Sequence, residues 1–409
     1  MSFVVRWSLC LALLTVCSHS LAWGKAELHP RLFTRGEYND NIFLSKDRRG
    51  DFVATVEPGI SGRYETRSLV LDADYALRFR FYERFDERNE TQLKEIQRGL
   101  VRAELFSGRP FTLLVTDEYS RVVVDPRQPV AEDNPLVNTS GRNRLDVSPR
   151  YRLEGRSWRS DLVYRYERLD YTEPEGDDSQ AHIARVESMK KLGPRTELLL
   201  DLAGEERRFD FEADDYRRAD LTAGLRWQPT NRLTVAGWVG GAWIEPETGS
   251  NHRSRLWRLE GRWDLNPGLV GTVSYAEEVA LSVEDGLSET RQGDVALNWK
   301  GRNTAELRLY SREDDYLEID RRDRATGLDL RFAAPFGKVW ALRLAGRVEQ
   351  VAFRPLGEDA WRHRLEAAID YLGRRLTASI GAVRQGEDSD HDRNDYRNAI
   401  VYVQAGVRF

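Results

Sequence analysis

The sequence has 409 residues, of which 40% are hydrophobic, 32% charged and 10% aromatic, and its formal net charge is −5. The near balance of 62 Lys and Arg against 67 Asp and Glu argues against a nucleic-acid-binding protein, which would need a basic surface to neutralise phosphates. The aromatic content argues against a disordered chain. A soluble chain of this length would divide into domains, whereas one strand-like pattern runs through this sequence from end to end.

Residues 1–22 have the pattern of a secretory signal peptide. Arg6 supplies a positive charge, residues 7–16 form an apolar segment, and Ser20-Leu21-Ala22 fits a cleavage site. The apolar segment is shorter than the roughly 20 residues that cross a bilayer, which argues against an uncleaved anchor. Cleavage after Ala22 would remove both cysteines of the chain, so the predicted mature domain, residues 23–409, has no disulfide and no thiol chemistry.

Long alternating segments follow. Residues 69–82 place Leu71, Tyr75 and Phe79 on one face of a strand and Asp72 and Arg80 on the other. A strand of soluble proteins averages about 5–6 residues, whereas a tilted bilayer-crossing strand needs about 9–11. The same alternation recurs in several later segments, namely 52–65, 145–154, 257–265 and 361–371. These segments predict membrane-crossing strands with one apolar and one charged face.

The predicted connections alternate between short turns and long acidic loops. Gly193-Pro194-Arg195 and Asn266-Pro267-Gly268 are typical tight turns, and 122–142 is the longest loop. Strict alternation of this kind is typical of an outer-membrane barrel. We therefore predict an all-β fold, a transmembrane antiparallel up-and-down β-barrel of about 20 strands (range about 16–22) with both termini in the periplasm.

Aromatic residues at strand ends support a membrane location. Trp158, Trp227, Trp263, Trp299 and Trp340 each lie beside a predicted short turn, where the periplasmic aromatic girdle of a barrel is expected. The last segment, 399–409, alternates and ends in Phe409, which is typical of the terminal signal read by the barrel-assembly machinery. The sequence thus predicts a protein in the outer membrane of a Gram-negative bacterium, in contact with its lipid and lipopolysaccharide.

The face opposite to the apolar one is rich in charges of both signs, and such a lumen has to be wet or internally paired. The candidate lumen-lining residues are arginines with a few aromatics that suit an anionic glycan, although ordinary strand filling explains them too. These candidates are Arg78, Arg80, Arg102, Arg150, Arg152, Trp238, Arg258, Arg262, Tyr310, Arg362, Arg364 and Tyr402. Loop 122–142 is a candidate constriction or lid; the alternative is a loop that only covers the extracellular mouth.

Catalytic and metal-binding patterns are weak. The five histidines of the predicted mature chain are scattered, and the sequence contains neither a His-Glu-x-x-His motif nor a Gly-x-Ser-x-Gly elbow. Loops 312–323 and 386–394 contain acidic clusters that are explained better as solvated loop tips than as calcium sites. We therefore predict no catalytic residues, no cofactor, no metal site and no enzymatic activity.

Residues 38–43, Tyr-Asn-Asp-Asn-Ile-Phe, follow the first predicted strand. This segment resembles the Tyr-x-Asp-Asn-aliphatic motif of a family of outer-membrane β-barrel porins associated with exopolysaccharide and PEP-CTERM protein-sorting gene clusters. The motif is short, while the architecture from signal peptide to terminal Phe covers the whole chain. The resemblance implies an outer-membrane barrel in polysaccharide export and transfers no catalytic residue.

The function that these patterns favour is a porin-like outer-membrane channel for small polar solutes or for an exported exopolysaccharide. Two alternatives remain. The first is a structural or assembly barrel whose lumen is plugged by paired charges. The second is an outer-membrane hydrolase with a site assembled across strands.

Overall fold

The computed structural model describes residues 24–129, 136–172, 176–211, 213–282, 286–390 and 394–409. The predicted signal peptide, residues 1–22, lies outside the described residues and stays a prediction. The chain forms strands, two very short helices and their connections. The strands in chain order are β1 (Lys25–Asn39), β2 (Asp51–Glu65), β3 (Leu69–Leu77), β4 (Phe79–Tyr82), β5 (Gln97–Leu105), β6 (Phe111–Val123), β7 (Thr139–Glu154), β8 (Trp158–Tyr171), β9 (Ser179–Gly193), β10 (Thr196–Phe209), β11 (Tyr216–Thr230), β12 (Leu233–Pro246), β13 (His252–Asn266), β14 (Leu269–Leu281), β15 (Leu287–Lys300), β16 (Thr304–Tyr316), β17 (Arg322–Phe336), β18 (Trp340–Arg354), β19 (Glu358–Leu372), β20 (Leu376–Ser389) and β21 (Tyr396–Arg408).

The two helices lie in one connection. The 3₁₀-helix η1 (Asp86–Arg88) and the α-helix α2 (Leu93–Ile96) both lie between β4 and β5. Neither of them is long and apolar enough to cross a membrane, and no other helix occurs in the described residues.

The strands form one closed antiparallel barrel. Each crossing of the wall pairs with its neighbours in sequence, and β1 pairs with β21 from Arg31–Arg408 to Asn39–Ile400, which closes the ring. β3 and β4 both pair with β2 and are one crossing of the wall, interrupted at Arg78. The predicted fold, about 20 antiparallel strands in a barrel, is therefore confirmed.

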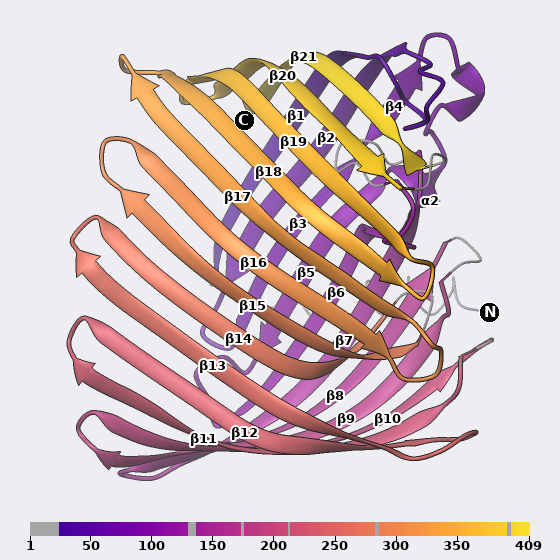
Figure 1. Cartoon of the computed structure of the whole chain (residues 1–409). Coiled ribbons are helices and arrows are strands. Elements are labelled where there is room, and N and C mark those ends of the chain that lie inside the picture. The colour runs from indigo at the N-terminus through magenta and orange to yellow at the C-terminus, as the bar shows by residue number, and fades with distance from the viewer. Residues whose placement is uncertain (1–23, 130–135, 173–175, 212, 283–285, 391–393) are drawn as a thin grey trace.

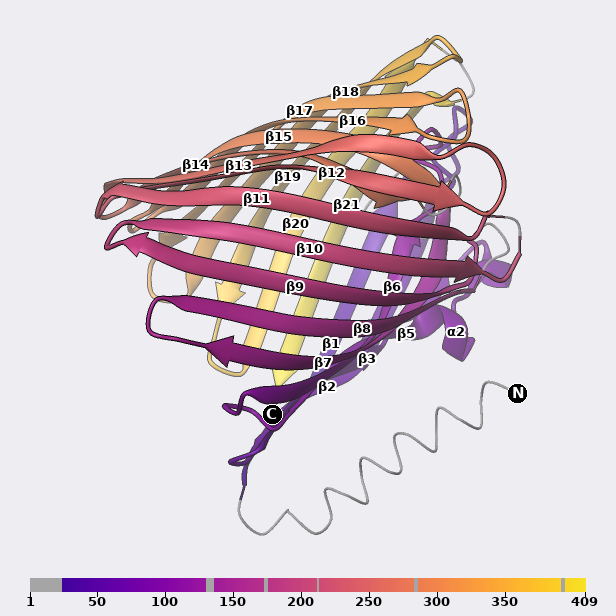
Figure 2. The ribbon, with the colours of Figure 1, turned by 90° about the horizontal axis from the view of Figure 1, so that it is seen from below.

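The strands run obliquely in Figure 1, with short turns on the left and with α2 and the longer connections on the right. In Figure 2, β7–β11 lie in front of β19–β21, and the two walls enclose the interior. Both described ends of the chain, at β1 and β21, lie at the short-turn end of the barrel.

The outer face carries exposed apolar and aromatic side chains. The five tryptophans predicted for the girdle are 44–55% exposed at the short-turn end, next to the turns that they precede or follow. At the other border of the apolar face lies Trp361 (54% exposed), ten residues from Tyr371 on the same strand, β19. Ten residues of a strand with a rise of about 3.3 Å and a tilt of about 40° span about 25 Å, the height of the apolar band of outer-membrane barrels.

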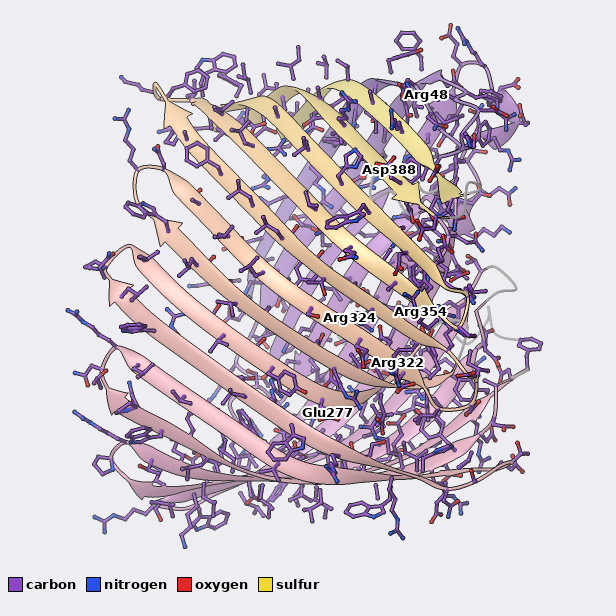
Figure 3. The ribbon with its side chains drawn as sticks, viewed as in Figure 1. Arg48, Glu277, Arg322, Arg324, Arg354 and Asp388 are labelled. Carbon is purple, nitrogen blue, oxygen red and sulfur yellow. The ribbon has the colours of Figure 1, made fainter. Side chains whose placement is uncertain are left out.

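Beyond that band, the outer face becomes charged. Glu277, Arg322, Arg324 and Arg354 lie on the near wall in the right half of Figure 3, toward the long-loop end. Arg322 pairs with Asp315 at 2.7 Å and Arg354 with Asp359 at 3.1 Å. The apolar band and this charged zone match a wall that passes from hydrocarbon to headgroups.

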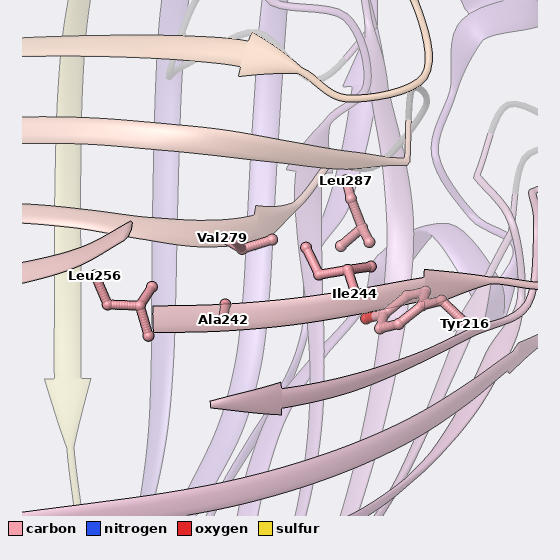
Figure 4. Close-up of a cluster of buried hydrophobic side chains, with 6 residues drawn as sticks. All are labelled: Tyr216, Ala242, Ile244, Leu256, Val279 and Leu287. Carbon is pink, nitrogen blue, oxygen red and sulfur yellow. The ribbon is translucent and has the colours of Figure 1, made fainter. Parts of the chain in front are cut away.

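The wall splits locally between β13 and β14. Their register ends at Trp257–Glu277, although β13 begins at His252 and β14 continues to Leu281. A buried apolar cluster lies at the split, made of Tyr216, Ala242, Ile244, Leu256, Val279 and Leu287 (Figure 4). The guanidinium of Arg218 donates to the Val279 carbonyl at 2.8 Å, so a side chain supplies a hydrogen bond beyond the end of the ladder.

The Tyr-x-Asp-Asn segment stabilises the seam between β1 and β21. The backbone N–H of Ala399 donates to Asp40 Oδ1 at 2.6 Å. Asn41 is fully buried, and its Nδ2 donates to the carbonyls of Ser45 (2.7 Å) and Arg397 (3.1 Å). The first loop is thereby tied to the last strand at the point where the barrel closes.

We predict that Asn41→Ala lowers the free energy of unfolding by about 2–4 kcal/mol, because it removes several hydrogen bonds and leaves the Arg397 carbonyl unsatisfied. Urea unfolding of the barrel in lipid vesicles, followed by tryptophan fluorescence, measures the change. The control is Arg48→Ala, because its 3.5 Å pair with Asp40 is half-exposed and is expected to contribute less than about 1 kcal/mol. Equal effects of the two variants would contradict the role of Asn41.

Candidate functional site

The inner face of the barrel is covered with ion pairs, both between neighbouring strands and within one strand. Arg152 pairs with Asp161 at 2.8 Å, Arg258 with Glu260 at 2.6 Å, and Arg347 with Asp329 at 2.7 Å. Arg152 and Asp161, and likewise Arg347 and Asp329, face each other because the register places their side chains on the same side of the sheet. The interior is therefore hydrophilic and largely paired.

The predicted lumen residues are distributed around the whole ring. Arg78 lies at the interruption of the third crossing, where its Nε is 2.5 Å from Glu57. Arg80 faces Thr55 in the β2–β4 register, and Arg102 faces Asp72 across β3 and β5. Arg150 faces Thr112 on β6 and Val163 on β8. Arg102 and Arg150 line one cavity of about 520 Å³ together with Arg152, whereas Arg78 and Arg80 lie toward the long-loop end of the wall.

Other predicted residues contact aromatic rings. The Arg258 guanidinium lies 5.2 Å from the Trp238 ring, and Arg262 on the same strand pairs with Asp264 at 3.0 Å. The Tyr310 hydroxyl donates to Glu349 at 2.8 Å. Stacking on arginine leaves these rings partly occupied by the protein's own charges.

Arg364 and Tyr402 do meet in one cluster. The Tyr402 hydroxyl donates to Glu366 at 2.9 Å, and Arg364 pairs with the other oxygen of Glu366 at 3.1 Å. Arg343 pairs with Glu366 at 2.6 Å and with Asp370 at 3.1 Å, and the Arg35 guanidinium lies 4.2 Å from the Tyr402 ring. This cluster spans β18, β19, β21 and β1 and so bridges the seam of the barrel.

The longest predicted loop turns inward and crosses the mouth. We call residues 124–128, which follow β6, the strap. Asn138 holds its base: Asp125 N–H donates to Asn138 Oδ1 at 2.8 Å, and Val124 N–H donates to the Asn138 carbonyl at 3.2 Å. Asn138 has φ 54°, a left-handed conformation that asparagine tolerates. Residues 130–135 of this loop lie outside the described residues.

Three side chains from distant parts of the barrel contact the strap, one from a strand and two from connections. Arg321, between β16 and β17, lies 3.6 Å from Asp125. Arg362 Nη2 on β19 donates to the Pro126 carbonyl at 2.8 Å, and Asn394 Nδ2 donates to the Arg127 carbonyl at 3.2 Å. Around the ring, β20 and β6 are separated by β21, β1, β2, β3 with β4, and β5. The strap therefore extends from one side of the mouth to another.

Two other connections pack with Leu136, which lies in the same loop as the strap. Ile42 and Val53 are buried with Tyr82, and the partly buried Phe85 and Leu136 lie against them. Phe43 and Phe85 meet edge to face with ring centroids 5.0 Å apart. We call residues 40–50, 83–92 and 136–138 together with the strap the loop cap. A polar cavity of about 450 Å³ remains within it, beside Glu90, Arg121 and Gln128.

The strap contains a carboxylate, that of Asp125, whose charged form the surrounding groups stabilise. Burial by itself raises the pKa of Asp125, but hydrogen bonds from the Arg127 side chain and backbone outweigh it, and Arg321 adds attraction. The pKa of Asp125 consequently lies below its ordinary value. The charged form of Asp125 is thus favoured in the folded cap.

Several residues of this site differ from the sequence-based expectation. Glu387 and Asp388 were expected in a solvated loop, 386–394, but both lie in β20, and Glu387 is fully buried against Arg362 at 3.0 Å. The strand continues because its inward carboxylate finds an arginine there. Loop 312–323 is shortened likewise, since β16 extends to Tyr316. Among the described residues, no cluster could hold a metal ion. Residues 391–393 of loop 386–394 lie outside the described residues.

The strap contacts were not predictable as such. Loop 122–142 was a candidate lid because of its length and apolar character, but nothing in the spacing of Asp125, Arg321 and Asn394 indicates that they meet. Their contacts join positions 236 and 267 residues apart in two cases.

No protein-family model matches the chain, and no similar curated protein was found. The resemblance to porins of exopolysaccharide gene clusters therefore stays a prediction. Solved structures share the fold at low identity. The iron transporter FrpB of Neisseria meningitidis is 8% identical with a TM-score of 0.50, over 93% of this chain and 81% of that chain. The siderophore receptor PirA of Pseudomonas aeruginosa is 9% identical with a TM-score of 0.51, over 94% and 80%. A mutant of the ferric enterobactin receptor PfeA of the same organism is 10% identical with a TM-score of 0.52, over 95% and 81%.

These likenesses concern the fold. A closed antiparallel barrel with an apolar outer band is the fold of outer-membrane proteins, and the outer membrane of a Gram-negative bacterium is the location of this one.

We predict that acidification releases the strap. A group with a depressed pKa stabilises the folded contact above its ordinary pKa of 3.8 and loses this effect as the pH falls through and below that value. In planar bilayers, the open fraction should therefore rise as the pH falls below about 3.8. Asp125→Asn should raise it about 5-fold already at pH 7, the result of losing about 1 kcal/mol, and should respond less to pH.

The matched control is Asp388→Asn, whose carboxylate is exposed on the outer wall (Figure 3). It should behave as the unmodified protein. An open fraction that stays constant or decreases on acidification would exclude the proposed role of Asp125.

Proposed function

We propose that this protein is a gated outer-membrane channel for polar solutes. The observation that carries the proposal is the strap, a segment that extends across the mouth and is held by three separate contacts to distant parts of the wall. A barrel that served only as a structural element would not need a removable contact across its opening. A channel needs such a contact to control passage.

The size of the ring supports this proposal. Barrels of about 16–18 strands enclose an aqueous channel, whereas 22-stranded transporters hold a plug in the lumen. The ring described here lies between these classes, and its own loop cap lies at one end. The charged inner face suits hydrated solutes, because unpaired charges in a dry lumen would cost several kcal/mol each.

The structural neighbours are by name iron transporters and siderophore receptors, and they support a transport role in general but no particular cargo. An exported polysaccharide is the second candidate cargo, favoured by the resemblance of residues 38–43 and by the inward arginines. The transport proposed here involves no chemical step and no cofactor. In this proposal, the long-loop end faces the cell exterior and both termini face the periplasm.

Single-channel conductance of the refolded protein tests this function. We predict that replacing residues 126–137 with a short Gly-Ser linker increases the open fraction at least about 5-fold, because the Arg362 and Asn394 contacts with the strap disappear. The mean current should rise correspondingly.

The control replaces residues 247–251, a loop at the same end between β12 and β13, and should leave the current unchanged. If both barrels are shown to be folded and both remain silent, the protein is a plugged structural barrel. If the unmodified protein conducts as well as the strap variant, the strap is not the gate.

A further inference from the structure

A group of buried polar atoms without hydrogen-bond partners lies on the inner wall next to the strap. Among the described residues, these atoms are Arg362 Nε, Gln385 Nε2, Glu387 Oε2 and both Oδ1 and Nδ2 of Asn398. Gln385, Glu387 and Asn398 are 3%, 0% and 2% exposed. A buried polar atom without a partner costs about 1–3 kcal/mol, so five of them in one place call for a functional explanation.

These residues are immediate neighbours. Arg362 faces Glu387 across β19 and β20, and Gln385 faces Asn398 across β20 and β21. Glu387 Oε1 accepts from Arg362 Nη2 at 3.0 Å, and Gln385 Oε1 accepts from Arg364 Nη1 at 3.0 Å. Arg362 Nε, the second oxygen of Glu387, the amide nitrogen of Gln385 and both polar atoms of Asn398 are left without a partner. We call Arg362, Gln385, Glu387 and Asn398 the wall site.

The loop cap contacts the wall site. The Pro126 carbonyl of the strap accepts a hydrogen bond from Arg362 at 2.8 Å. Leu44 of the first loop and Tyr396 of β21 are buried together, and Val137 near the base of the strap lies against them. The unpartnered polar atoms of the wall site are buried from solvent, and the strap contacts the site through Arg362.

The unpartnered atoms indicate what they would bind. Three of them are donors, on Arg362, Gln385 and Asn398, and two are acceptors, on Glu387 and Asn398. A simple cation or anion would satisfy only one of these kinds. A hydroxyl group both donates and accepts, and neighbouring hydroxyls on a sugar ring offer both functions at short spacing.

We propose that the wall site binds a hydroxyl-rich solute, a sugar unit, and that the strap and this solute compete for it. In the closed state the Pro126 carbonyl takes the position of a solute oxygen on Arg362. When the solute binds, its hydroxyls satisfy the remaining polar atoms and the strap leaves. This inference rests on the proposed channel function and names its substrate class.

Calorimetry on the full-length barrel in detergent tests the proposal without any need for conduction. The probes are maltohexaose, cellohexaose, chitohexaose and hexagalacturonate. At least one should bind, and Asn398→Leu should weaken that binding about 10-fold or more, since two hydrogen-bonding atoms are lost. The control Gln404→Met changes an inward residue nearer the short-turn end of β21, where Gln404 donates to Ser379 at 3.4 Å, and should bind as the unmodified protein does.

Thermal unfolding separates a binding role from a structural one. Asn398→Leu removes two unsatisfied polar atoms and should leave the melting temperature unchanged or raise it. A purely structural asparagine would lower it on substitution. A lowered melting temperature together with unchanged sugar binding would therefore overturn the proposal.

A last experiment tests whether the sugar and the strap compete for the wall site. The variant with residues 126–137 replaced should bind the same sugar several-fold more tightly, because no energy is spent on displacing the Pro126 contact. Equal affinity, or no binding of any of the four sugars by either form, would overturn the inference. A conducting channel without sugar binding refutes only this inference, whereas a silent barrel that binds sugar refutes only the channel.

Discussion

Every backbone N–H and C=O group in the lipid-facing part of the wall needs a partner from a neighbouring strand, because lipid supplies none. This requirement forces the sheet to close, and the remainder of the structure follows from the closure. Once β1 pairs with β21, the register of each strand decides which side chains face lipid and which face the interior. A shift by one residue would exchange the two faces.

Departures from regular pairing are compensated by other groups. At the interruption of the third crossing, Arg78 N–H donates to the carbonyl of Ile96 at 2.7 Å, so the end of α2 replaces the missing strand partner. At the split between β13 and β14, the Arg218 side chain supplies a donor and an apolar cluster fills the space. Both irregularities lie toward the long-loop end, where the wall is no longer required to face hydrocarbon.

The charges of the interior follow a similar logic. Most inward arginines are held by carboxylates on the same or the next strand, which leaves the lumen polar while keeping each charge satisfied. The wall site is one of several exceptions, because five buried polar atoms of its side chains have no hydrogen-bond partner. The strap contacts the wall site through a hydrogen bond from Arg362 to the Pro126 carbonyl. A hydrogen bond to a backbone carbonyl is easier to replace than a buried ion pair. A closed state that leaves polar atoms unsatisfied is one that a suitable solute can displace.

The amino-acid sequence by itself determined the barrel. Alternation such as that of residues 69–82, the tight turn at Asn266-Pro267-Gly268 and the tryptophans beside the turns are local signals, because a strand has a period of two and a turn depends on a few adjacent residues. The same signals indicated which face of each strand is charged. They could not show that Glu387 belongs to a strand, since its partner Arg362 lies on another one. The tertiary structure alone decided that the strap meets Arg321, Arg362 and Asn394, and that Gln385 and Asn398 lie side by side. These contacts join residues far apart in the chain, and only the closure and register of the whole ring bring them together.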